Sequence, residues 1–444
     1  MPAEQRPPAG RPVVIVGFVA AALASLKDFQ PDGSVIFVEE PDVVRKRQVH
    51  DKIAGCTLVQ SLIEWEYHLG GKADEFYHAH PDLDPAAIVP LVEYATPFAA
   101  RLAERYGLPG AGFGAAQILR DKALLRQVSG AAGIPNPEMT RVSGPADVAA
   151  FMREFPGRVV LKPANRQASV GTQVIHSLDE VEQAWANCVQ QDEGIFVPDR
   201  TMDLHMLVER FVDGAEFSVE MLVRDGDPLF VNVTGKQLFP GSRPVELAHI
   251  VPADIAPDLA ALLGEQTRKV VEAVGFLDGI VHCEWIVAGE DAYLVECAGR
   301  FAGDGIIELI QRAYPVELVR YYYSVMKGEQ LPDVLPQRAK AAAAVRFLAI
   351  EPGVVADVRG VEQAEQAAGV FLCDVSVKPG DRFDGLRSSW DRVGDVMVTA
   401  SSPAEALRLA EAAAGLVRID MVAAPAEPAP AGPAPAGQMA IATP

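Results

Sequence analysis

The chain has 444 residues, of which 49% are hydrophobic and 22% are charged, and this composition indicates a globular protein long enough for two to four domains. Its 39 basic and 60 acidic residues give a net charge of −21. Because such a surface repels phosphate backbones, we expect no nucleic-acid partner, and an anionic substrate needs a local basic site. The five cysteines are scattered without a CxxC pair, which favours a reducing cytoplasm over a disulfide framework or a zinc site. No apolar run reaches the ~18 residues of a membrane span, so no membrane partner is expected.

The N-terminal part predicts an open α/β module. Residues 1–12 are Pro-rich and predicted to be loose, and residues 13–114 alternate strand and helix signals. Strands are predicted at 13–17 and 35–39, and an amphipathic helix at 89–106. The first strand–helix turn lacks a GxGxxG pattern, so dinucleotide binding is not expected.

A lysine and a loop of small residues follow in the next region. A helix is predicted to begin at Asp121-Lys122, and residues 158–163 form an apolar strand that ends with Lys162. The loop at 164–172 leads into a strand at 173–176. Backbone N–H groups of such a loop can bind phosphates, and a lysine adds a compact point charge. The alternative is an ordinary hairpin with a lysine at its edge.

The segment 207–220 is a second candidate, here for a purine slot. An apolar strand runs into an acidic residue, a short linker and another strand. Backbone groups near Phe211 and Val212 could reach the base edge, while Glu209 accepts from the adenine amine and Glu216 from ribose hydroxyls. The alternative is a connector with surface acids.

Two hairpins dominate the sequence between 205 and 300, the first formed by 216–224 and 228–237. In the second, a three-residue loop at 289–291 places Glu284 opposite Glu296. Like charges directly opposite each other destabilise a hairpin, and a divalent cation between them reverses that penalty. The alternative is a solvent-exposed acidic ladder.

Strict alternation puts both carboxylates on a mostly apolar face, where unpaired charges are costly. The neighbours on that face would be Ile280, Ile286, Leu294 and Ala298.

Other residues divide into structural and functional candidates. His249, three residues after Glu246, is either a satisfied structural histidine or part of a site. His78 and His80 form an HxH pattern without a nearby third ligand, which indicates surface residues. Trp285 and the tyrosines at 321–323 are interpreted as core.

The C-terminal part predicts a further α+β unit. Residues 306–327 look helical, residues 340–420 hold short strands, and a final Ala-rich helix is predicted at 403–414. The Ala/Pro-rich tail at 423–444 has low complexity and is predicted to be disordered.

The order of these motifs resembles the ATP-grasp superfamily across about residues 115–330. Residues 13–114 resemble the pre-ATP-grasp domain, and 331–422 resemble the C-terminal domain of biotin-carboxylase-like members. The resemblance implies an α/β and α+β architecture, with a small lid subdomain at about 138–208. Within the superfamily, the sequence is most similar to carboxylate–amine ligases, notably L-amino acid ligases that make dipeptides.

The resemblance implies a set of residues that bind ATP through its phosphates, adenine and ribose. The phosphate residues would be Lys122, Lys162, Ser169, Gly171 and Thr172; the adenine residues Glu209, Phe211 and Val212; and the ribose residue Glu216.

The resemblance also implies metal ligands and catalytic residues. Glu284 and Glu296 would hold Mg²⁺, as one or two ions, with Mn²⁺ as an alternative. Arg300 would stabilise the acyl phosphate and the tetrahedral intermediate, and His249 would lie near the reacting phosphate. The superfamily often has Glu-x-Asn after the second ligand, but Ala298 stands at that third position, which puts tight binding of one ion in doubt. Asp304 has no assigned role.

These expectations predict an ADP-forming ligase that joins a small-molecule carboxylate, by default an amino acid, to an amine through an acyl phosphate. A cytoplasmic homodimer is expected from the family. One alternative is a bicarbonate-activating enzyme like biotin carboxylase, although no Met-Lys-Met carrier motif occurs. A second alternative is a non-catalytic ATP-binding regulatory protein, which the intact lysines, glutamates and arginine argue against.

Overall fold

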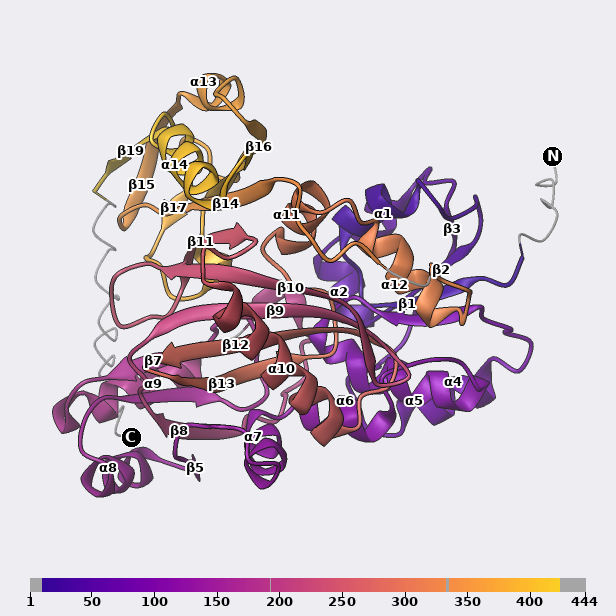
Figure 1. The fold of residues 1–444 in the computed structure, drawn as a ribbon, viewed down its shortest axis with the longest axis horizontal. Coiled ribbons are helices and arrows are strands. Elements are labelled where there is room, and N and C mark those ends of the chain that lie inside the picture. Colours follow the sequence, from indigo (N-terminus) through magenta and orange to yellow (C-terminus); the bar gives the residue numbers. More distant parts are fainter. Residues whose placement is uncertain (1–9, 192, 333–334, 424–444) are drawn as a thin grey trace, which may run out of the picture.

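The structure is a computed structural model that describes residues 10–191, 193–332 and 335–423. The predicted loose N-terminus and the predicted disordered tail lie almost wholly outside these ranges. Figure 1 shows an N-terminal α/β module on one side, a long sheet in the centre, and a C-terminal region beside one end of that sheet. No helix among the described residues is long and apolar enough to cross a membrane.

A parallel four-stranded sheet forms the N-terminal module, in the order β3-β2-β1-β4. Its inner strands are buried along their whole length, as expected when helices cover both faces. The strands are β1 (Val13–Val16), β2 (Val35–Glu39), β3 (Val59–Glu64) and β4 (Ala87–Pro90). The helices are α1 (Ala20–Leu26), α2 (Pro41–Lys46), α3 (Val49–Ile53), α4 (Lys72–Ala79), the 3₁₀ turn η1 (Glu93–Ala95) and α5 (Thr96–Tyr106).

The predicted helix at 89–106 is wrong in its first part. Ala87–Pro90 is the buried strand β4, and α5 begins only at Thr96, where Pro97 fits the first helical turn. The predicted end is confirmed, because α5 stops at Tyr106 and Gly107 takes a left-handed conformation with φ 65°.

A small antiparallel sheet with the order β5-β8-β6-β7 follows, and it carries the predicted phosphate loop between β6 and β7. Asp121 caps the helix that leads into it by accepting hydrogen bonds from the backbone N–H groups of Ala123 and Leu124, which confirms the predicted helix start. The strands are β5 (Met139–Val142), β6 (Val159–Pro163), β7 (Gln173–Ile175) and β8 (Met206–Arg210). The helices are α6 (Phe113–Leu119), α7 (Lys122–Ala131), α8 (Pro145–Glu154), η2 (Leu178–Glu180), α9 (Val181–Gln190) and η3 (Gly194–Phe196).

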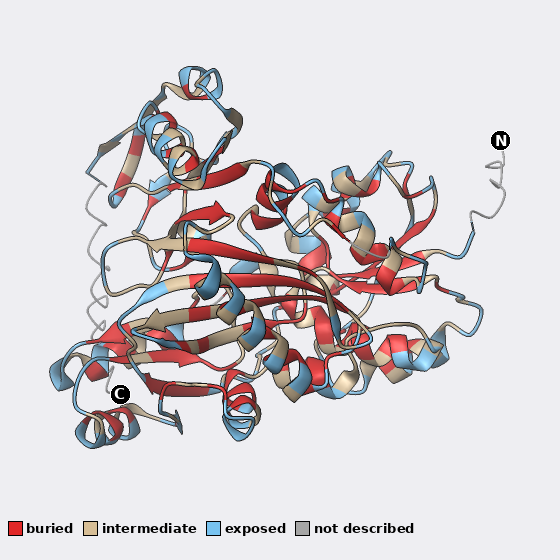
Figure 2. Ribbon diagram, viewed as in Figure 1, coloured by how far each residue is buried: buried red, intermediate tan, exposed pale blue. Residues whose placement is uncertain are grey.

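The long sheet has eight antiparallel strands in the order β13-β12-β9-β10-β11-β14-β18-β16. Figure 2 shows much of its length buried. The strands are β9 (Ala215–Arg224), β10 (Asp227–Leu238), β11 (Glu246–Val251), β12 (Gly279–Ala288), β13 (Asp291–Ala298), β14 (Ala342–Leu348), β16 (Val370–Val375) and β18 (Gly394–Ala400).

Helices cover both faces of this sheet. The helix α10 (Pro257–Val274) covers one face, and α11 (Ile306–Ala313) and α12 (Leu318–Met326) lie against the other. The predicted helical segment 306–327 is thus two helices, interrupted around Pro315, which cannot continue a helix hydrogen-bond ladder.

The C-terminal region extends the same sheet rather than forming a separate one. Strand β11 pairs with β14, so the hydrogen-bond ladder crosses the predicted domain boundary at 330/331. A smaller sheet, β17-β15-β19, stands beside it. Its elements are β15 (Gly353–Arg359), α13 (Val361–Glu365), β17 (Arg382–Phe383), η4 (Ser389–Asp391), α14 (Pro403–Ala414) and β19 (Arg418–Val422). The final helix α14 has the predicted bounds.

Candidate functional site

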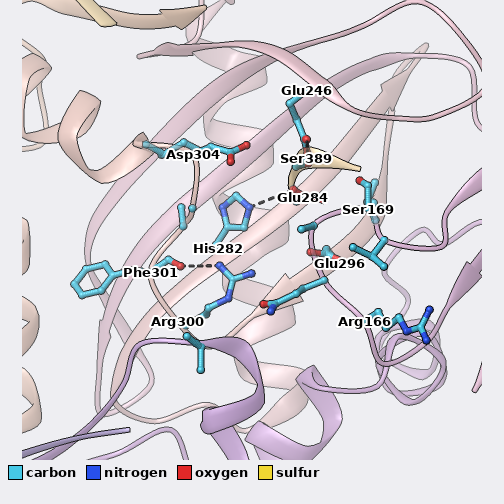
Figure 3. A pocket seen from close by; sticks show the side chains of 18 of the residues that line it. Arg166, Ser169, Glu246, His282, Glu284, Glu296, Arg300, Phe301, Asp304 and Ser389 are labelled. Carbon is cyan, nitrogen blue, oxygen red and sulfur yellow. Dashed lines mark hydrogen bonds and ion pairs between the residues drawn. The ribbon is translucent and has the colours of Figure 1, made fainter. Parts of the chain in front are cut away.

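One cavity of about 580 Å³ brings together twelve of the thirteen predicted site residues. The N-terminal module, the small sheet, the long sheet and the C-terminal loop at 389–392 all contribute to its wall. Figure 3 shows labelled side chains of the loop after β6, of the long sheet and of the C-terminal loop around this cavity. The twelve residues are Lys122, Lys162, Ser169, Thr172, Glu209, Phe211, Val212, Glu216, His249, Glu284, Glu296 and Arg300.

The hairpin of β12 and β13 places Glu284 opposite Glu296, as predicted, but by a different route. The turn has two residues rather than three, because Ala288 pairs with Asp291. A β-bulge next to Glu284 leaves Val295 without a partner and restores the predicted register. The prediction was therefore right about the pair and wrong about the turn.

The bulge also corrects the predicted surroundings of the two carboxylates. Leu294 does not share their face but packs with Trp285 in the core under α10. On the cavity side, Glu284 is accompanied by His282, which a hydrogen bond links to the fully buried Glu220. The expected mostly apolar face is wrong, because this part of the sheet carries a buried polar network.

A lysine and a histidine neutralise Glu284. Its carboxylate forms an ion pair with Lys236, and His282 Nε2 lies 3.2 Å from Glu284 Oε1. Lys236 Nζ also lies 3.8 Å from Glu246. Burial opposes ionisation of Glu284, but Lys236 and His282 hold its pKa well below the usual value. Burial likewise opposes the charge on His282, yet hydrogen bonds to Glu220 and Glu284 raise its pKa to about 9.

A second lysine neutralises Glu296. Lys122 Nζ lies 2.7 Å from Glu296 Oε2 and donates a 2.9 Å hydrogen bond to the carbonyl oxygen of Arg166. Burial opposes the charge on Lys122, but Glu296 and Glu93 outweigh it and raise the lysine pKa. Each predicted metal ligand therefore has its own lysine, as expected for carboxylates that are taken out of water.

The predicted adenine residue Glu209 lies in a buried charge cluster. It forms ion pairs with Lys162 and, at 3.1 Å, with Arg126. Burial lowers the pKa of Lys162, and although burial works against the charge on Glu209, the two cations lower its pKa. The structure thus links the predicted phosphate lysine directly to the predicted purine slot.

The remaining slot residues follow β8. The backbone N–H of Phe211 donates to the carbonyl oxygen of Arg158, whose guanidinium lies 4.1 Å from the centre of the Phe211 ring. Val212 and Glu216 line the cavity beside it. Burial raises the pKa of Glu216 to about 7.

The predicted phosphate loop is held in an unusual backbone conformation. Ala168, Ser169 and Gly171 all have positive φ angles, of 55°, 57° and 72°. A Cβ atom at Gly171 would approach the carbonyl oxygen of Cys188 to 2.7 Å, so this position requires glycine. Ser169 Oγ donates to the carbonyl oxygen of Pro244, which ties the loop to the long sheet.

Arg300 is fixed by the N-terminal module. Its Nε and Nη2 atoms lie 3.2 and 2.8 Å from Glu93 Oε2, and its Nη1 donates to the carbonyl oxygen of Phe301. Arg120 also approaches Glu93, at 3.4 Å. Burial opposes the charge on Arg300, but Glu93 and Glu296 raise its pKa.

Asp304, which had no assigned role, holds His249 in place. His249 Nε2 donates to Asp304 Oδ2 at 3.0 Å, and Arg392 of the C-terminal loop forms an ion pair with both oxygens of Asp304. Arg392 also lies 3.7 Å from the centre of the Phe347 ring. His249 is buried, and its Nδ1 atom has no hydrogen-bond partner within the described ranges.

Sequence reasoning missed four charged residues of this site, namely Glu93, Arg126, Glu220 and Lys236. Lys236 and Glu220 belong to a polar–apolar alternation along their strands, and this alternation was the available signal. Glu93 and Arg126 carried no such signal, because their partners are distant in the sequence.

A divalent metal ion fits the two carboxylates. Within the described ranges no group of three or more histidine, cysteine, aspartate or glutamate side chains could hold a metal ion. Glu284 and Glu296 nevertheless face each other at the cavity, and hard oxygen donors suit Mg²⁺. Waters and nucleotide phosphates commonly supply the other ligands of Mg²⁺.

The fold and the cavity agree with the comparison to known proteins. Residues 155–308 match the family model described as ATP-grasp domain. A biotin carboxylase from Campylobacter jejuni has the same fold, with a TM-score of 0.62 and 15% identity over 93% of this chain and 92% of that one. Residues 155–308 thus match an ATP-grasp domain, and the solved structures share the fold, which confirms the predicted fold class.

The C-terminal region gives a more specific match than the ATP-grasp domain does. Residues 346–422 match the family model of L-amino acid ligase C-terminal domain 2. The L-amino acid ligase of Bacillus licheniformis superposes with a TM-score of 0.73 and 17% identity, over 93% of this chain and 99% of that one. An alanine–anticapsin ligase of Bacillus subtilis is 26% identical over 433 residues, covering 88% of this chain and 87% of the relative. An L-arginine-specific L-amino acid ligase of the same species is 24% identical, over 64% and 68% of the two chains.

Proposed function

We propose that this protein is an ADP-forming ligase that joins a carboxylate to an amine, with amino acids as the substrates of both kinds. The observation that carries this proposal is the pair Glu284 and Glu296, directly opposite on the hairpin and facing the cavity that Lys122, Lys162 and Arg300 also line. The relatives are named as ligases of amino acids, and this supports the predicted ligase class.

The first step transfers the γ-phosphoryl group of ATP to the substrate carboxylate. Lys122 and Lys162 place positive charge where phosphate oxygens would lie, and the loop at 168–172 closes over them. A Mg²⁺ or Mn²⁺ ion bound by Glu284 and Glu296 would supply further charge neutralisation. ATP and a divalent ion are general requirements of the superfamily, whereas these residue roles and the number of ions are our assignment.

The second step is attack of the amine on the acyl phosphate. Arg300, held by Glu93, directs its guanidinium toward the oxyanion that develops on the acyl carbon. His249 lies at the same cavity with its orientation fixed by Asp304. The closed loop excludes water, which would otherwise hydrolyse the acyl phosphate.

The test is ADP release with Mg-ATP against a matrix of amino-acid pairs, followed by mass spectrometry of the products. We expect release that requires two particular amino acids and a product condensed by loss of one water. ADP release that requires bicarbonate would favour the biotin-carboxylase-like alternative. ATP binding without release under any condition would favour the regulatory one. Cytoplasmic location and a homodimer are part of the proposal, and size-exclusion chromatography with light scattering tests the latter.

A further inference from the structure

The cations that line the cavity differ in how their charge is balanced. Six of eight lysine and arginine side chains form ion pairs with a carboxylate. The pairs are Lys122–Glu296, Lys162–Glu209, Arg210–Glu138, Lys236–Glu284, Arg300–Glu93 and Arg392–Asp304. Arg47 and Arg166 form no ion pair within the described part of the chain.

Arg166 belongs to the phosphate side of the cavity. It lies in the predicted phosphate loop at 164–172, and its guanidinium donates to the carbonyl oxygens of Cys188 and Gln191. The phosphates of a bound nucleotide would balance the charge of Arg166 at this position. Arg47 lies instead at the C-terminal end of α2 in the N-terminal module, so its charge needs another explanation.

The guanidinium of Arg47 is only partly satisfied by the protein. Its Nη1 donates a 2.7 Å hydrogen bond to the carbonyl oxygen of Phe18, and its carbon lies 5.8 Å from the centre of the Phe18 ring and 5.1 Å from that of Phe196. Its other nitrogens have no hydrogen-bond partner among residues 10–191, 193–332 and 335–423. Because they are not fully buried either, they are open to the cavity that Arg47 lines.

The carboxylate that acts electrostatically on Arg47 does not form an ion pair with it. Glu39 interacts with Arg47 electrostatically but forms no ion pair with it in the described structure. Its carboxylate accepts hydrogen bonds from the backbone N–H groups of Phe18 and Glu40 and from the hydroxyl of Tyr67, at 2.7, 2.8 and 2.9 Å. Burial lowers the pKa of Arg47 and raises that of Glu39, as expected for a cation that lacks a close anionic partner.

Apolar side chains line the same cavity as Arg47. The helices α1, α11 and α12 contribute most of them, and they belong to one hydrophobic cluster. The apolar wall residues are Leu26, Leu91, Phe301, Ile306, Ile307, Val319 and Tyr323. Phe196, beside Arg47, stacks on Trp390 at 4.2 Å, so the N-terminal module, the small-sheet region and the C-terminal region meet here.

We infer that Arg47 binds the non-reacting carboxylate of the amine substrate, and this rests on the proposed function. A guanidinium fork in a partly apolar wall selects a planar anion by charge-assisted hydrogen bonds. The carboxylate that reacts must lie at Glu284, Glu296 and the phosphate lysines, and Arg47 contacts none of these. A ligated amino-acid pair keeps one free carboxylate, that of the amine substrate. The amine substrate is therefore an amino acid with its carboxylate free, with an apolar side chain against the wall, rather than a simple amine.

The experiment uses the most active pair from the ADP-release matrix, with the amine substrate offered as the amino acid and as its primary carboxamide. In the native protein the carboxamide should have a KM about 10²-fold higher, because it lacks the charge that Arg47 binds. Arg47→Met should raise the KM for the amino acid by a similar factor and remove the preference over the carboxamide. We expect kcat and the KM for ATP to change little, and Arg47→Lys to be intermediate.

Lys52→Met is the matched control, because Lys52 is an exposed cation on the neighbouring helix α3. Unchanged discrimination between acid and carboxamide in Arg47→Met would overturn the inference, and so would an equal rise in KM for ATP and both amino acids, which indicates a structural contact with Phe196. Absence of ADP release with every pair in the native protein would instead overturn the proposed function, and this inference with it.

Discussion

The long sheet contains two pairs of carboxylates, each formed by residues directly opposite on neighbouring strands. The two pairs differ in how their charge is compensated. Glu284 and Glu296 lie on β12 and β13 near one edge, and Asp374 and Asp395 lie on β16 and β18 at the other. Like charges directly opposite destabilise a sheet in both cases.

In the first pair, each carboxylate forms an ion pair with its own lysine. In the second pair, burial and the neighbouring Asp374 raise the pKa of Asp395 to about 6, and Asp395 Oδ2 has no hydrogen-bond partner among the described residues. The repulsion between two facing carboxylates can thus be reduced by neighbouring cations or by protonation of one carboxyl group. The arrangement with cations compensates both carboxylates directly, whereas the second pair has no such lysines in the described part of the chain.

The largest effect is expected when the first pair is broken. Glu296→Ala removes one of the two proposed metal ligands and leaves Lys122 without its partner. ADP formation should fall by about 10³-fold or more, because metal and lysine charge act together on the transferred phosphoryl group. Glu290→Gln, in the exposed turn of the same hairpin, is the control. Near-normal turnover in Glu296→Ala would contradict the metal assignment.

The next largest effect is expected when the lysine partner of Glu284 is removed. Lys236→Met removes the lysine partner of the partly buried Glu284 and leaves only His282, which costs about 3 kcal/mol of stability. We expect ADP formation about 10²-fold lower. Mg²⁺ should then raise the unfolding temperature of the variant more than that of the native protein, since the ion replaces the lost charge. An equal response of both proteins to Mg²⁺, measured by calorimetry, would argue against metal binding at Glu284.

A smaller effect is expected from the residue behind the pair. Glu220 accepts hydrogen bonds from Ser218, Asn232, Thr234 and His282, and His282 in turn contacts Glu284. Glu220→Gln should loosen this support and weaken Mn²⁺ binding about 10-fold, as for other residues that orient metal ligands. Titration of Mn²⁺ followed by electron paramagnetic resonance measures this.

The control for this titration is Glu272→Gln on the exposed side of α10. An unchanged Mn²⁺ affinity in Glu220→Gln would show that this network serves folding alone.

The smallest effect is expected at the second pair. The native protein holds a proton on Asp395 up to about pH 6, whereas the unfolded chain releases it near its ordinary value of 3.8. Stability from this proton is therefore present below pH 3.8 and lost as the pH rises through about 6. Asp395→Asn removes the charge, so it should stabilise the protein by about 1 kcal/mol at pH 8 and by less at pH 5. Equal gains at both pH values, measured by urea unfolding, would contradict the raised pKa.

The motifs along the chain could be predicted because local physics determines them. Asp121 caps its helix through its own side chain, Gly107 ends a helix in a left-handed conformation, and the pairing of β9 with β10 follows from a short turn between two apolar runs. The predicted resemblance to ATP-grasp ligases is confirmed by the matched family models and the named relatives.

The wrong details have a common cause, because register and burial depend on partners far away in the chain. The stretch at 89–95 was predicted as helix because the sequence does not show that β1 needs a parallel neighbour on that side. The bulge at Val295 changes which residues share a face with Glu284, and strict alternation cannot anticipate it.

The sequence by itself determined the order of motifs, the acidic and lysine residue types, and hence the class of chemistry. Only the tertiary structure decided which charges compensate each other, since Glu93, Lys236 and Asp304 meet Arg300, Glu284 and His249 from distant segments. It also left Arg47 without an ion-pair partner among the described residues. The physical reason is that the energy of an ion pair depends on the distance between the charges and on their burial. The spacing of residues along the chain gives neither quantity.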